Sequence, residues 1–308
     1  QVESLDWHVL GLEHEGQEIT PNLNALRASS MLFQVQAVHR NGSADADFIM
    51  LHRCMVAPGV INYKIAGYPH DDTLPAAARA AGRPMTFLHG NKGRFFNRRD
   101  AFDQMDFAEL IFLEELRDTY EQEPKKWGAV PDRELLMLSA RLLNEANSPQ
   151  SQLVITYTSH TPFVMLPDEA ERPFANPDDT VALRYFNSIH YVDLAIGAYL
   201  DALPVGTTVV VYADHEGAAG YDARHRVSGE PELIPVLVWR KGEDLSIRQR
   251  SAGLPEARSG VWSIIDVAAW IRGSFDAAAA PPAAPPPAAA AAPEARRGSS
   301  SSSSSSSS

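Results

Sequence analysis

The sequence predicts an α/β fold in which a largely parallel central sheet is covered by helices on both faces. Segments with strand character alternate along the chain with segments of helical periodicity, which is the pattern of parallel α/β sheets. Most of the expected strands are apolar without polar alternation, which indicates a sheet buried on both faces. Ionisable residues follow several of these strands, at the edge where open α/β sheets bind their ligands.

The beginning of the chain supplies two expected strand segments and one expected helix. Residues 1–5 have the character of the C-terminal end of a strand. Thr20 followed by Pro21 predicts a helix start, with threonine as N-cap and proline at the first helical position. Residues 31–38 alternate between apolar and polar side chains and therefore predict a strand.

The stretch from residue 41 to residue 50 allows two interpretations. It predicts a turn followed by a helix, with Ser43 as N-cap and with Asp45 and Asp47 near the positive end of the helix dipole. Alternatively, Ser43 is a nucleophile at a helix N-terminus, where backbone N–H groups can bind a phosphate. The stretch alone does not separate these interpretations.

The rest of the chain continues the alternation and then changes in composition. Helices are expected over residues 73–81, 132–146, 179–203 and 259–272, and strands over residues 84–88, 153–157, 207–212 and 234–239. From residue 277 the sequence consists largely of alanine and proline and then of serine, which cannot form a packed core. We therefore expect one catalytic domain over residues 1–275 and a disordered tail over residues 276–308.

Composition excludes several classes of function. The chain of 308 residues has a formal net charge of -12, and it has no basic stripe with which to bind nucleic acid. The single cysteine, Cys54, excludes an internal disulfide framework and a cysteine-rich zinc site. No apolar run is long enough to predict a membrane span. Because the chain opens abruptly within an expected strand, we expect it to be a fragment that lacks an upstream part.

Four residues at expected strand or helix ends form a candidate metal-binding set. Asp214 and His215 follow an apolar strand, Glu3 ends another, and Ser43 begins the helix described above. Three oxygen donors and one nitrogen donor suit Mn²⁺, Mg²⁺ or Zn²⁺ better than copper or an iron–sulfur centre. An isolated Asp–His pair is more often part of a local turn network.

Four further residues are candidates for binding a phosphate. His89 and His160 also follow expected strands and can bind a phosphate or a leaving oxygen, although a single histidine of this kind is more often a loop residue. Arg98 can clamp a phosphate with two hydrogen bonds, and a solvated arginine at a helix start is the alternative. His225 follows the Asp–His pair and can approach the same site.

Seven stretches, taken in order, resemble the extracellular catalytic domain of the lipoteichoic acid synthase family, within the alkaline phosphatase and sulfatase superfamily. Together they extend over residues 1–275, and each is a weak signal by itself. The stretches are Glu3–Leu5, Thr20–Asn24, Gly42–Phe48, Phe87–Asn91, Phe96–Arg98, Thr158–Phe163 and Asp214–Gly217.

The resemblance implies an alkaline phosphatase-like fold and a role for each matching residue. The implied metal ligands are Glu3, Ser43, Asp214 and His215, with Ser43 also the nucleophile. The implied substrate-binding residues are His89, Phe96, Arg98 and His160, of which Arg98 and His160 also take part in catalysis. The implied metal is Mn²⁺, with Mg²⁺ or Zn²⁺ as alternatives.

The resemblance also implies a phosphoglycerol transferase. The donor would be an anionic phospholipid such as phosphatidylglycerol, the intermediate a covalent phospho-serine, and the acceptor a hydroxyl of a glycan or glycolipid. The domain would lie in the periplasm or at the extracellular face of the inner membrane, anchored by upstream transmembrane helices. Two positions depart from the family pattern: Ser43 stands where threonine is usual, and Phe96 where tryptophan usually supplies an indole N–H donor.

Four other functions are weighed against this one. Phosphoethanolamine transferases commonly use several disulfides, which one cysteine disfavours, and a phosphodiesterase of the same superfamily is a further alternative. Sulfatases need proline or alanine two places after the nucleophile and arginine four places after it, where this chain has Asp45 and Asp47. An inactive binding module is disfavoured because all four implied metal ligands are present.

Overall fold

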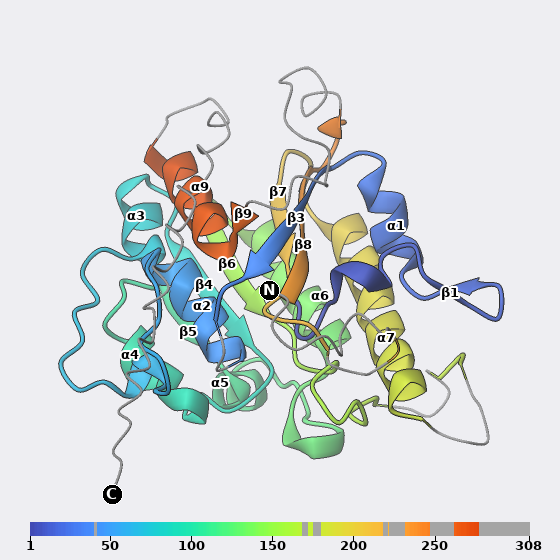
Figure 1. Cartoon of the computed structure of the whole chain (residues 1–308). Helices are drawn as coiled ribbons and strands as arrows, with labels where there is room; N and C mark the ends of the chain where they lie inside the picture. The colour runs from blue at the N-terminus through green and yellow to red at the C-terminus, as the bar shows by residue number, and fades with distance from the viewer. Residues whose placement is uncertain are drawn as a thin grey trace, which may run out of the picture.

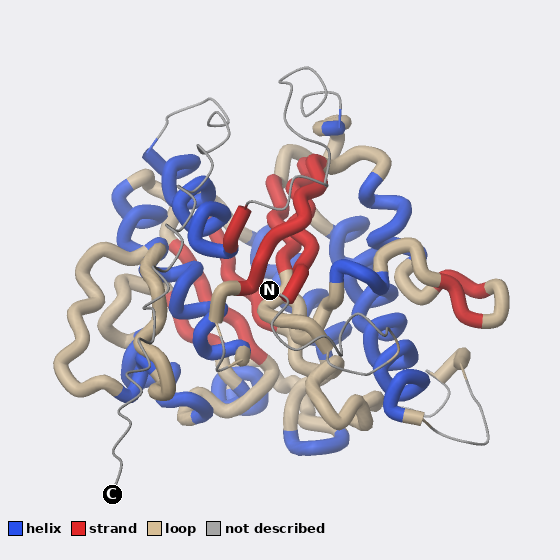
Figure 2. The backbone as a smooth tube through the Cα atoms, viewed as in Figure 1, coloured by secondary structure: helices blue, strands red, loops and turns tan. Residues whose placement is uncertain are grey.

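A computed structural model of the chain describes residues 1–39, 42–167, 172–174, 180–217, 221, 232–246 and 262–276 (Figure 1). The expected tail after residue 276 lies outside these ranges, and so do Asn41 of the predicted turn and His225. Within the described residues, helices flank a central group of strands on both sides, as the tube in Figure 2 shows.

The central sheet has two halves. The first half is parallel throughout and has the order β5 (Glu109–Ile111), β4 (Met85–His89) and β6 (Ser151–Ile155). The second half has the order β7 (Thr208–Tyr212), β8 (Glu232–Arg240), β3 (Met31–Ala37) and β9 (Trp262–Ser263). A separate two-stranded ribbon pairs β1 (Glu13–His14) with β2 (Gln17–Glu18).

The first residues of the chain join the two halves. The backbone nitrogen of Gln1 donates to the carbonyl of Val154 at 2.8 Å, and the N–H of Thr156 donates back to the Gln1 carbonyl at 3.1 Å. On the other side, Val2 forms a parallel bridge with Ala213, next to the end of β7. The predicted strand end at residues 1–5 is therefore confirmed for its first residues, which lie between β6 and β7.

The described strands of the central sheet are parallel with one exception. β8 pairs antiparallel with both β3 and β7, whereas β9 pairs parallel with β3. The predicted largely parallel sheet is thus confirmed, with β8 as the strand that runs against the others. The carboxyl ends of β3, β4, β6 and β7 consequently meet at the same edge of the sheet.

Two groups of helices cover the faces of the sheet (Figure 1). On one face, α2 (Ser43–His52), α3 (Leu74–Ala80) and α9 (Ile264–Asp276) pack against one another. On the other face, α7 (Val181–Ala202) packs against both α1 (Pro21–Arg27) and α6 (Asp132–Glu145). Among the described residues, no helix has both the length and the apolar character that crossing a bilayer requires.

Shorter elements complete the described structure around the sheet. The short α-helices are α4 (Arg98–Phe102) and α5 (Leu113–Asp118). The 3₁₀ turns are η1 (Trp7–Val9), η2 (Asn62–Lys64), η3 (Phe95–Asn97) and η4 (Lys126–Gly128). β5, α5 and the ribbon of β1 and β2 were not predicted from the sequence, since such short elements carry little periodicity.

The start of helix α1 is capped by a distant residue and not by its own N-cap. Thr20 and Pro21 occupy the positions predicted for them, but the Thr20 side chain makes no capping hydrogen bond. Instead, the buried Asp193 carboxylate of α7 accepts hydrogen bonds from the backbone N–H groups of Asn22 and Leu23, at 2.9 and 2.8 Å. This interaction ties α1 to α7 and satisfies helix donors that have no partner within the helix.

We predict that Asp193→Ala lowers the free energy of unfolding by about 1–3 kcal/mol, because two helix N–H groups lose a charged acceptor. Urea unfolding of the purified chain measures this change. The control is Asp201→Ala, at an exposed position of the same helix, which should change the value by less than about 0.5 kcal/mol. Equal effects of the two substitutions would contradict the capping role.

Candidate active site

Ionisable residues from distant parts of the chain meet at the carboxyl edge of the sheet. Glu3 follows the N-terminal strand segment, Ser43 begins α2 after β3, and Asp214 and His215 follow β7. The donor atoms of Glu3, Asp214 and His215 all lie within 4.8 Å of one another. The structure therefore brings together three of the predicted metal ligands, with the fourth, Ser43, in hydrogen-bond contact.

The Asp214 carboxylate has one satisfied oxygen and one unsatisfied oxygen. Its Oδ1 accepts hydrogen bonds from the backbone N–H groups of Ser4 and His215, both at 2.8 Å. Its Oδ2 is buried and has no hydrogen-bond partner among the described residues, while His215 Nε2 lies 3.8 Å away. Buried acceptors are normally paired, so this oxygen fits an additional cationic partner. The donor set therefore fits a divalent metal ion of the Mn²⁺, Mg²⁺ or Zn²⁺ type.

The Glu3 carboxylate accepts hydrogen bonds from both neighbouring serines. Ser43 Oγ donates to Glu3 Oε2 at 2.8 Å, and Ser4 Oγ donates to Glu3 Oε1 at 2.9 Å. His215 Nε2 lies 3.3 Å from Glu3 Oε1. Ser4 has a positive φ of 56°, which is uncommon outside glycine and is held here by hydrogen bonds of its N–H, hydroxyl and carbonyl groups.

Ser43 is the first residue of α2 and not its N-cap, which corrects the predicted position by one residue. Gly42 is the N-cap, with a φ of 71° that glycine adopts without strain. A Cβ atom on Gly42 would lie 3.8 Å from His215 Nε2, so this turn packs directly against the cluster of Glu3, Asp214 and His215. The Ser43 hydroxyl consequently bonds to Glu3 and does not cap the helix.

Burial and mutual charge set the ionisation of the cluster. Burial raises the pKa of Asp214 to about 7, and the Glu3 carboxylate adds to this rise. Burial also opposes the charged form of Glu3, but hydrogen bonds with His215 and Ser43 and the charges of His215 and His160 lower the pKa of Glu3 to about 2. Burial opposes the charged form of His215 too, yet the Asp214 and Glu3 carboxylates raise its pKa to about 10. The cluster thus attracts positive charge.

The two predicted phosphate-binding histidines lie near this cluster. His89 is the last residue of β4 and is buried, and its Nδ1 donates to the carbonyl of Ile155 at 3.1 Å. A carbonyl can only accept, so neutral His89 carries its proton on Nδ1 and keeps Nε2 as an acceptor. His160 is half-buried, and its Nδ1 lies 2.6 Å from the Thr161 carbonyl.

Arg98 is buried, whereas a solvated arginine was the alternative. Its side chain is 2% exposed, and its Nε donates to the Asp47 carboxylate at 2.6 Å. Its Nη2 is buried and lacks a hydrogen-bond partner among the described residues. The Phe96 ring centroid lies 5.2 Å from the guanidinium carbon, which is close enough for a cation–π contact.

Several supporting residues were missed by sequence reasoning. The Thr156 hydroxyl accepts the Glu3 N–H at 2.9 Å, and the Ser159 hydroxyl donates to the Glu3 carbonyl at 2.6 Å. His39 is buried, and its Nε2 lies 2.6 Å from the Asp214 carbonyl. Single residues of this kind have no motif, and only their position after β3 or β6 could have indicated them.

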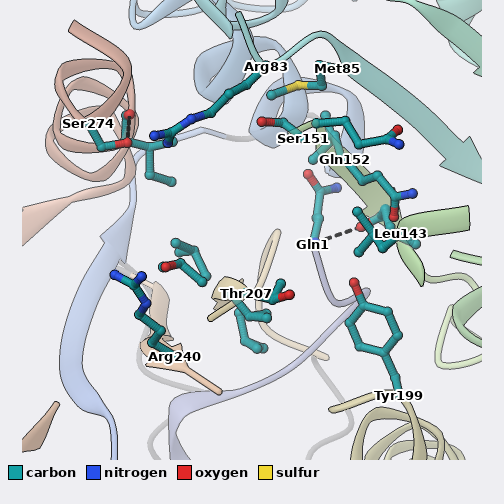
Figure 3. A pocket seen from close by; sticks show the side chains of 18 of the residues that line it. Gln1, Arg83, Met85, Leu143, Ser151, Gln152, Tyr199, Thr207, Arg240 and Ser274 are labelled. Atoms are coloured by element: carbon teal, nitrogen blue, oxygen red, sulfur yellow. Dashed lines mark hydrogen bonds between the residues drawn. The ribbon is translucent and has the colours of Figure 1, made fainter. Parts of the chain in front are cut away.

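A cavity of about 630 Å³ lies away from this site (Figure 3). Its lining includes Gln1, Ser151 at the start of β6, Thr208 at the start of β7 and Arg240 at the end of antiparallel β8. These residues mark the amino edge of the sheet, opposite to Ser43. None of the predicted site residues lines this cavity.

Comparison with protein families gives one match over most of the chain. The family described as Sulfatase matches residues 1–274. Lipoteichoic acid synthase 2 of Bacillus subtilis (strain 168) is 27% identical over 244 residues, which make up 75% of this chain and 37% of that protein. The chain therefore spans little more than a third of the length of this relative.

Comparison with solved structures supports the same fold. The lipoteichoic acid synthase LtaP from Listeria monocytogenes superposes with a TM-score of 0.69 and 19% identity, over 87% of this chain and 68% of that one. The Streptococcus pyogenes phosphoglycerol transferase GacH, solved in complex with sn-glycerol-1-phosphate, has a TM-score of 0.64 and 19% identity, over 91% and 78% of the two chains. These likenesses establish the alkaline phosphatase-like fold predicted from the sequence.

We predict that Asp214→Asn weakens Mn²⁺ binding by more than about 100-fold, which exceeds the usual cost of losing a residue that only supports a ligand. Isothermal titration calorimetry of the purified chain measures the affinity. The matched control, Asp201→Asn, removes an exposed carboxylate on α7 and should bind Mn²⁺ as the unchanged chain does. Equal affinity of Asp214→Asn and the control would exclude Asp214 as a ligand.

We further predict that His89 makes the chain sensitive to acid. Burial, together with the nearby Arg98 charge, lowers the pKa of His89 from 6.5 to about 3 in the folded chain. Between these values the unfolded chain binds a proton that the folded chain does not, so the free energy of unfolding falls as pH drops below 6.5. From pH 7.5 to pH 5.0, the free energy of unfolding of His89→Asn should fall by about 2 kcal/mol less than that of the unchanged chain.

Guanidinium unfolding at the two pH values measures this difference. The internal control is the interval from pH 7.5 to pH 8.5, where His89 is neutral in both states and the substitution should not alter the pH dependence. An equal loss of stability in both chains below pH 6.5 would show that His89 is not the group responsible.

Proposed function

This chain belongs to the sulfatase family, and from that premise we propose that it is a metal-dependent phosphoglycerol transferase that uses Ser43 as its nucleophile. The proposal adopts the family and the fold but not sulfatase chemistry, because Asp45 and Asp47 stand where a sulfatase needs proline or alanine and arginine. The catalytic domain is taken as residues 1–275, with residues 276–308 as a tail outside it.

One observation carries the proposal. The Ser43 hydroxyl donates to Glu3 at the N-terminus of α2, beside the unsatisfied Asp214 Oδ2 and the His215 imidazole. This arrangement combines a nucleophile, a set of hard metal ligands and backbone N–H groups that can bind an anion. An ordinary helix cap would need none of these neighbours.

The metal ion would be held by Glu3, Ser43, Asp214 and His215, and Mn²⁺ is the ion we propose. When bound, a divalent ion of this kind lowers the pKa of a coordinated hydroxyl and offsets negative charge on phosphate oxygens. His215, whose pKa the carboxylates raise to about 10, would then bind in its neutral form.

In the first half of the reaction, Ser43 Oγ attacks the phosphorus of a phosphatidylglycerol-type donor. The bond between Oγ and phosphorus forms while the bond from phosphorus to the diacylglycerol oxygen breaks. The Ser43 proton leaves by way of Glu3 Oε2, which already accepts it in a hydrogen bond of 2.8 Å. His160 supplies a proton to the departing alcohol, and the product on the chain is a phosphoglycerol-serine ester.

In the second half, the acceptor hydroxyl of a glycan or glycolipid attacks the same phosphorus. His160 takes the proton of this hydroxyl, the bond from phosphorus to Ser43 Oγ breaks, and Glu3 Oε2 returns the proton to Ser43 Oγ. The phosphoglycerol group leaves on the acceptor, and the chain returns to its starting state. His160 suits both proton transfers because it lies close to Glu3. The His160 charge helps to lower the pKa of Glu3, and the neighbouring Ser159 hydroxyl donates to the Glu3 carbonyl.

His89 and Arg98 would bind the phosphoglycerol group. Neutral His89 offers Nε2 as an acceptor for a glycerol hydroxyl, whereas Arg98 offers its Nη2 donors to phosphate oxygens. Phe96 would contribute its ring next to Arg98 and no polar donor. With lipid donors of this kind, we propose that the domain works at the extracytoplasmic face of a membrane.

We predict that Ser43→Ala abolishes phosphoglycerol transfer without unfolding the chain, because the variant has no nucleophilic oxygen. The chain is incubated with Mn²⁺ and phosphatidylglycerol, and its intact mass is measured. The unchanged chain should gain the mass of one phosphoglycerol group on Ser43, and Ser43→Ala should gain none.

The matched control is Ser29→Ala, which removes a hydroxyl that donates to the Leu26 carbonyl near the end of α1 and should leave the adduct intact. A phosphoglycerol adduct on Ser43→Ala, or one mapped to another residue, would refute the proposed nucleophile. Release of diacylglycerol with water as the sole acceptor would indicate a phosphodiesterase that uses the same site.

A further inference from the structure

Arg98 forms a buried ion pair with Asp47. We propose that Asp47 is a positioning residue, which together with Tyr63 fixes the Arg98 guanidinium so that its remaining N–H donors bind the substrate phosphate. This inference rests on the proposed function and extends it to residues that do not touch the substrate.

The pair lies in the interior of the protein. Asp47 is fully buried and Arg98 is 2% exposed, and Arg98 Nε donates to Asp47 Oδ2 at 2.6 Å. A buried guanidinium is costly unless its charge is balanced and its donors are satisfied. The carboxylate balances the charge through Nε alone, and Nη2 has no partner among the described residues. A phosphate oxygen is the acceptor that would complete this group.

Helix α2 links this pair to the nucleophile. Ser43 and Asp47 are four residues apart in the same helix, so their side chains lie on one face, one turn from each other. The Arg98 charge also helps to lower the pKa of His89, which places the guanidinium within electrostatic reach of another substrate-binding residue. Helix α2 therefore positions Ser43 directly and Arg98 through its ion pair with Asp47.

Tyr63 bonds to Asp47 directly and to Asn97, the residue that precedes Arg98. Its hydroxyl donates to the second oxygen of Asp47, Oδ1, at 2.9 Å. Its backbone carbonyl accepts a hydrogen bond from the Asn97 side chain at 2.8 Å. Asn97 and Phe96, just before Arg98, both have positive φ values, of 66° and 57°, so the chain enters α4 in a conformation that needs outside support.

The inference is tested by a double-mutant cycle with a binding readout. The dissociation constant of sn-glycerol-1-phosphate for the Mn²⁺-loaded chain is measured for the unchanged chain, Asp47→Asn, Arg98→Ala and the double variant. Asp47→Asn and Arg98→Ala should each weaken binding by roughly 10- to 100-fold, the scale of loss from misplacing a binding group by about 1 Å. The double variant should bind no more weakly than Arg98→Ala alone, since Asp47 acts through Arg98.

Tyr63→Phe provides a milder variant in case Asp47→Asn does not fold. It keeps both charges and removes only the hydroxyl. It should therefore weaken binding of sn-glycerol-1-phosphate about threefold to tenfold when Arg98 is present, and not at all when it is added to Arg98→Ala. Mn²⁺ affinity should be unchanged in every variant, because none of these residues belongs to the metal-ligand set.

The outcomes separate the two proposals. If Arg98→Ala weakens binding while Asp47→Asn and Tyr63→Phe do not, or if the effects add in the double variant, Asp47 has no positioning role. If the unchanged chain does not bind sn-glycerol-1-phosphate, or if Arg98→Ala binds it equally well, the proposed function of the site fails first. A loss of thermal stability without a loss of affinity would mark Asp47 as purely structural.

Discussion

The burial of Glu3 and Asp214 beside each other is the constraint on which the rest of the structure depends. Two carboxylates without water repel each other, and they are tolerated only where hydrogen-bond donors and positive charge surround them. The chain meets this need with two backbone N–H groups on Asp214, two serine hydroxyls on Glu3 and the His215 imidazole. One Asp214 oxygen still lacks a partner among the described residues, which leaves the cluster open to a cation.

The arrangement of the strands brings the residues of this cluster together. Gln1 and Val2 lie between β6 and β7 and join the two halves, so that Glu3 emerges between the loops after those strands. Each loop then contributes from its own side: Asp214 follows β7, and Ser159, after β6, donates to the Glu3 carbonyl. Helix α2 adds Ser43 from the end of β3. The site is therefore a property of the parallel topology and not of any single segment.

The sequence allowed the architecture, and the meeting of several candidate residues at one sheet edge, to be predicted, but not the bonds between these residues. Strand ends place side chains at a common edge, which is why Glu3, His89, Asp214 and His215 could be grouped before any coordinates were known. Local patterns failed where a distant partner decides the outcome. The local pattern at Ser43 allows an N-cap and gives no sign of its bond to Glu3, which spans forty residues. The pattern at Asp47 indicates only the helix dipole, because its partner, Arg98, lies in another helix. The antiparallel direction of β8 likewise has no signal in its apolar sequence.

One metal ion should contact groups from three segments of the chain, and anomalous diffraction from crystals grown with MnCl₂ tests this most directly. The expected result is a manganese peak within bonding distance of Glu3, Ser43, Asp214 and His215, next to the unsatisfied oxygen of Asp214. A manganese peak elsewhere, or fully occupied crystals in which Ser43 still donates to Glu3 with no ion between these residues, would contradict the account.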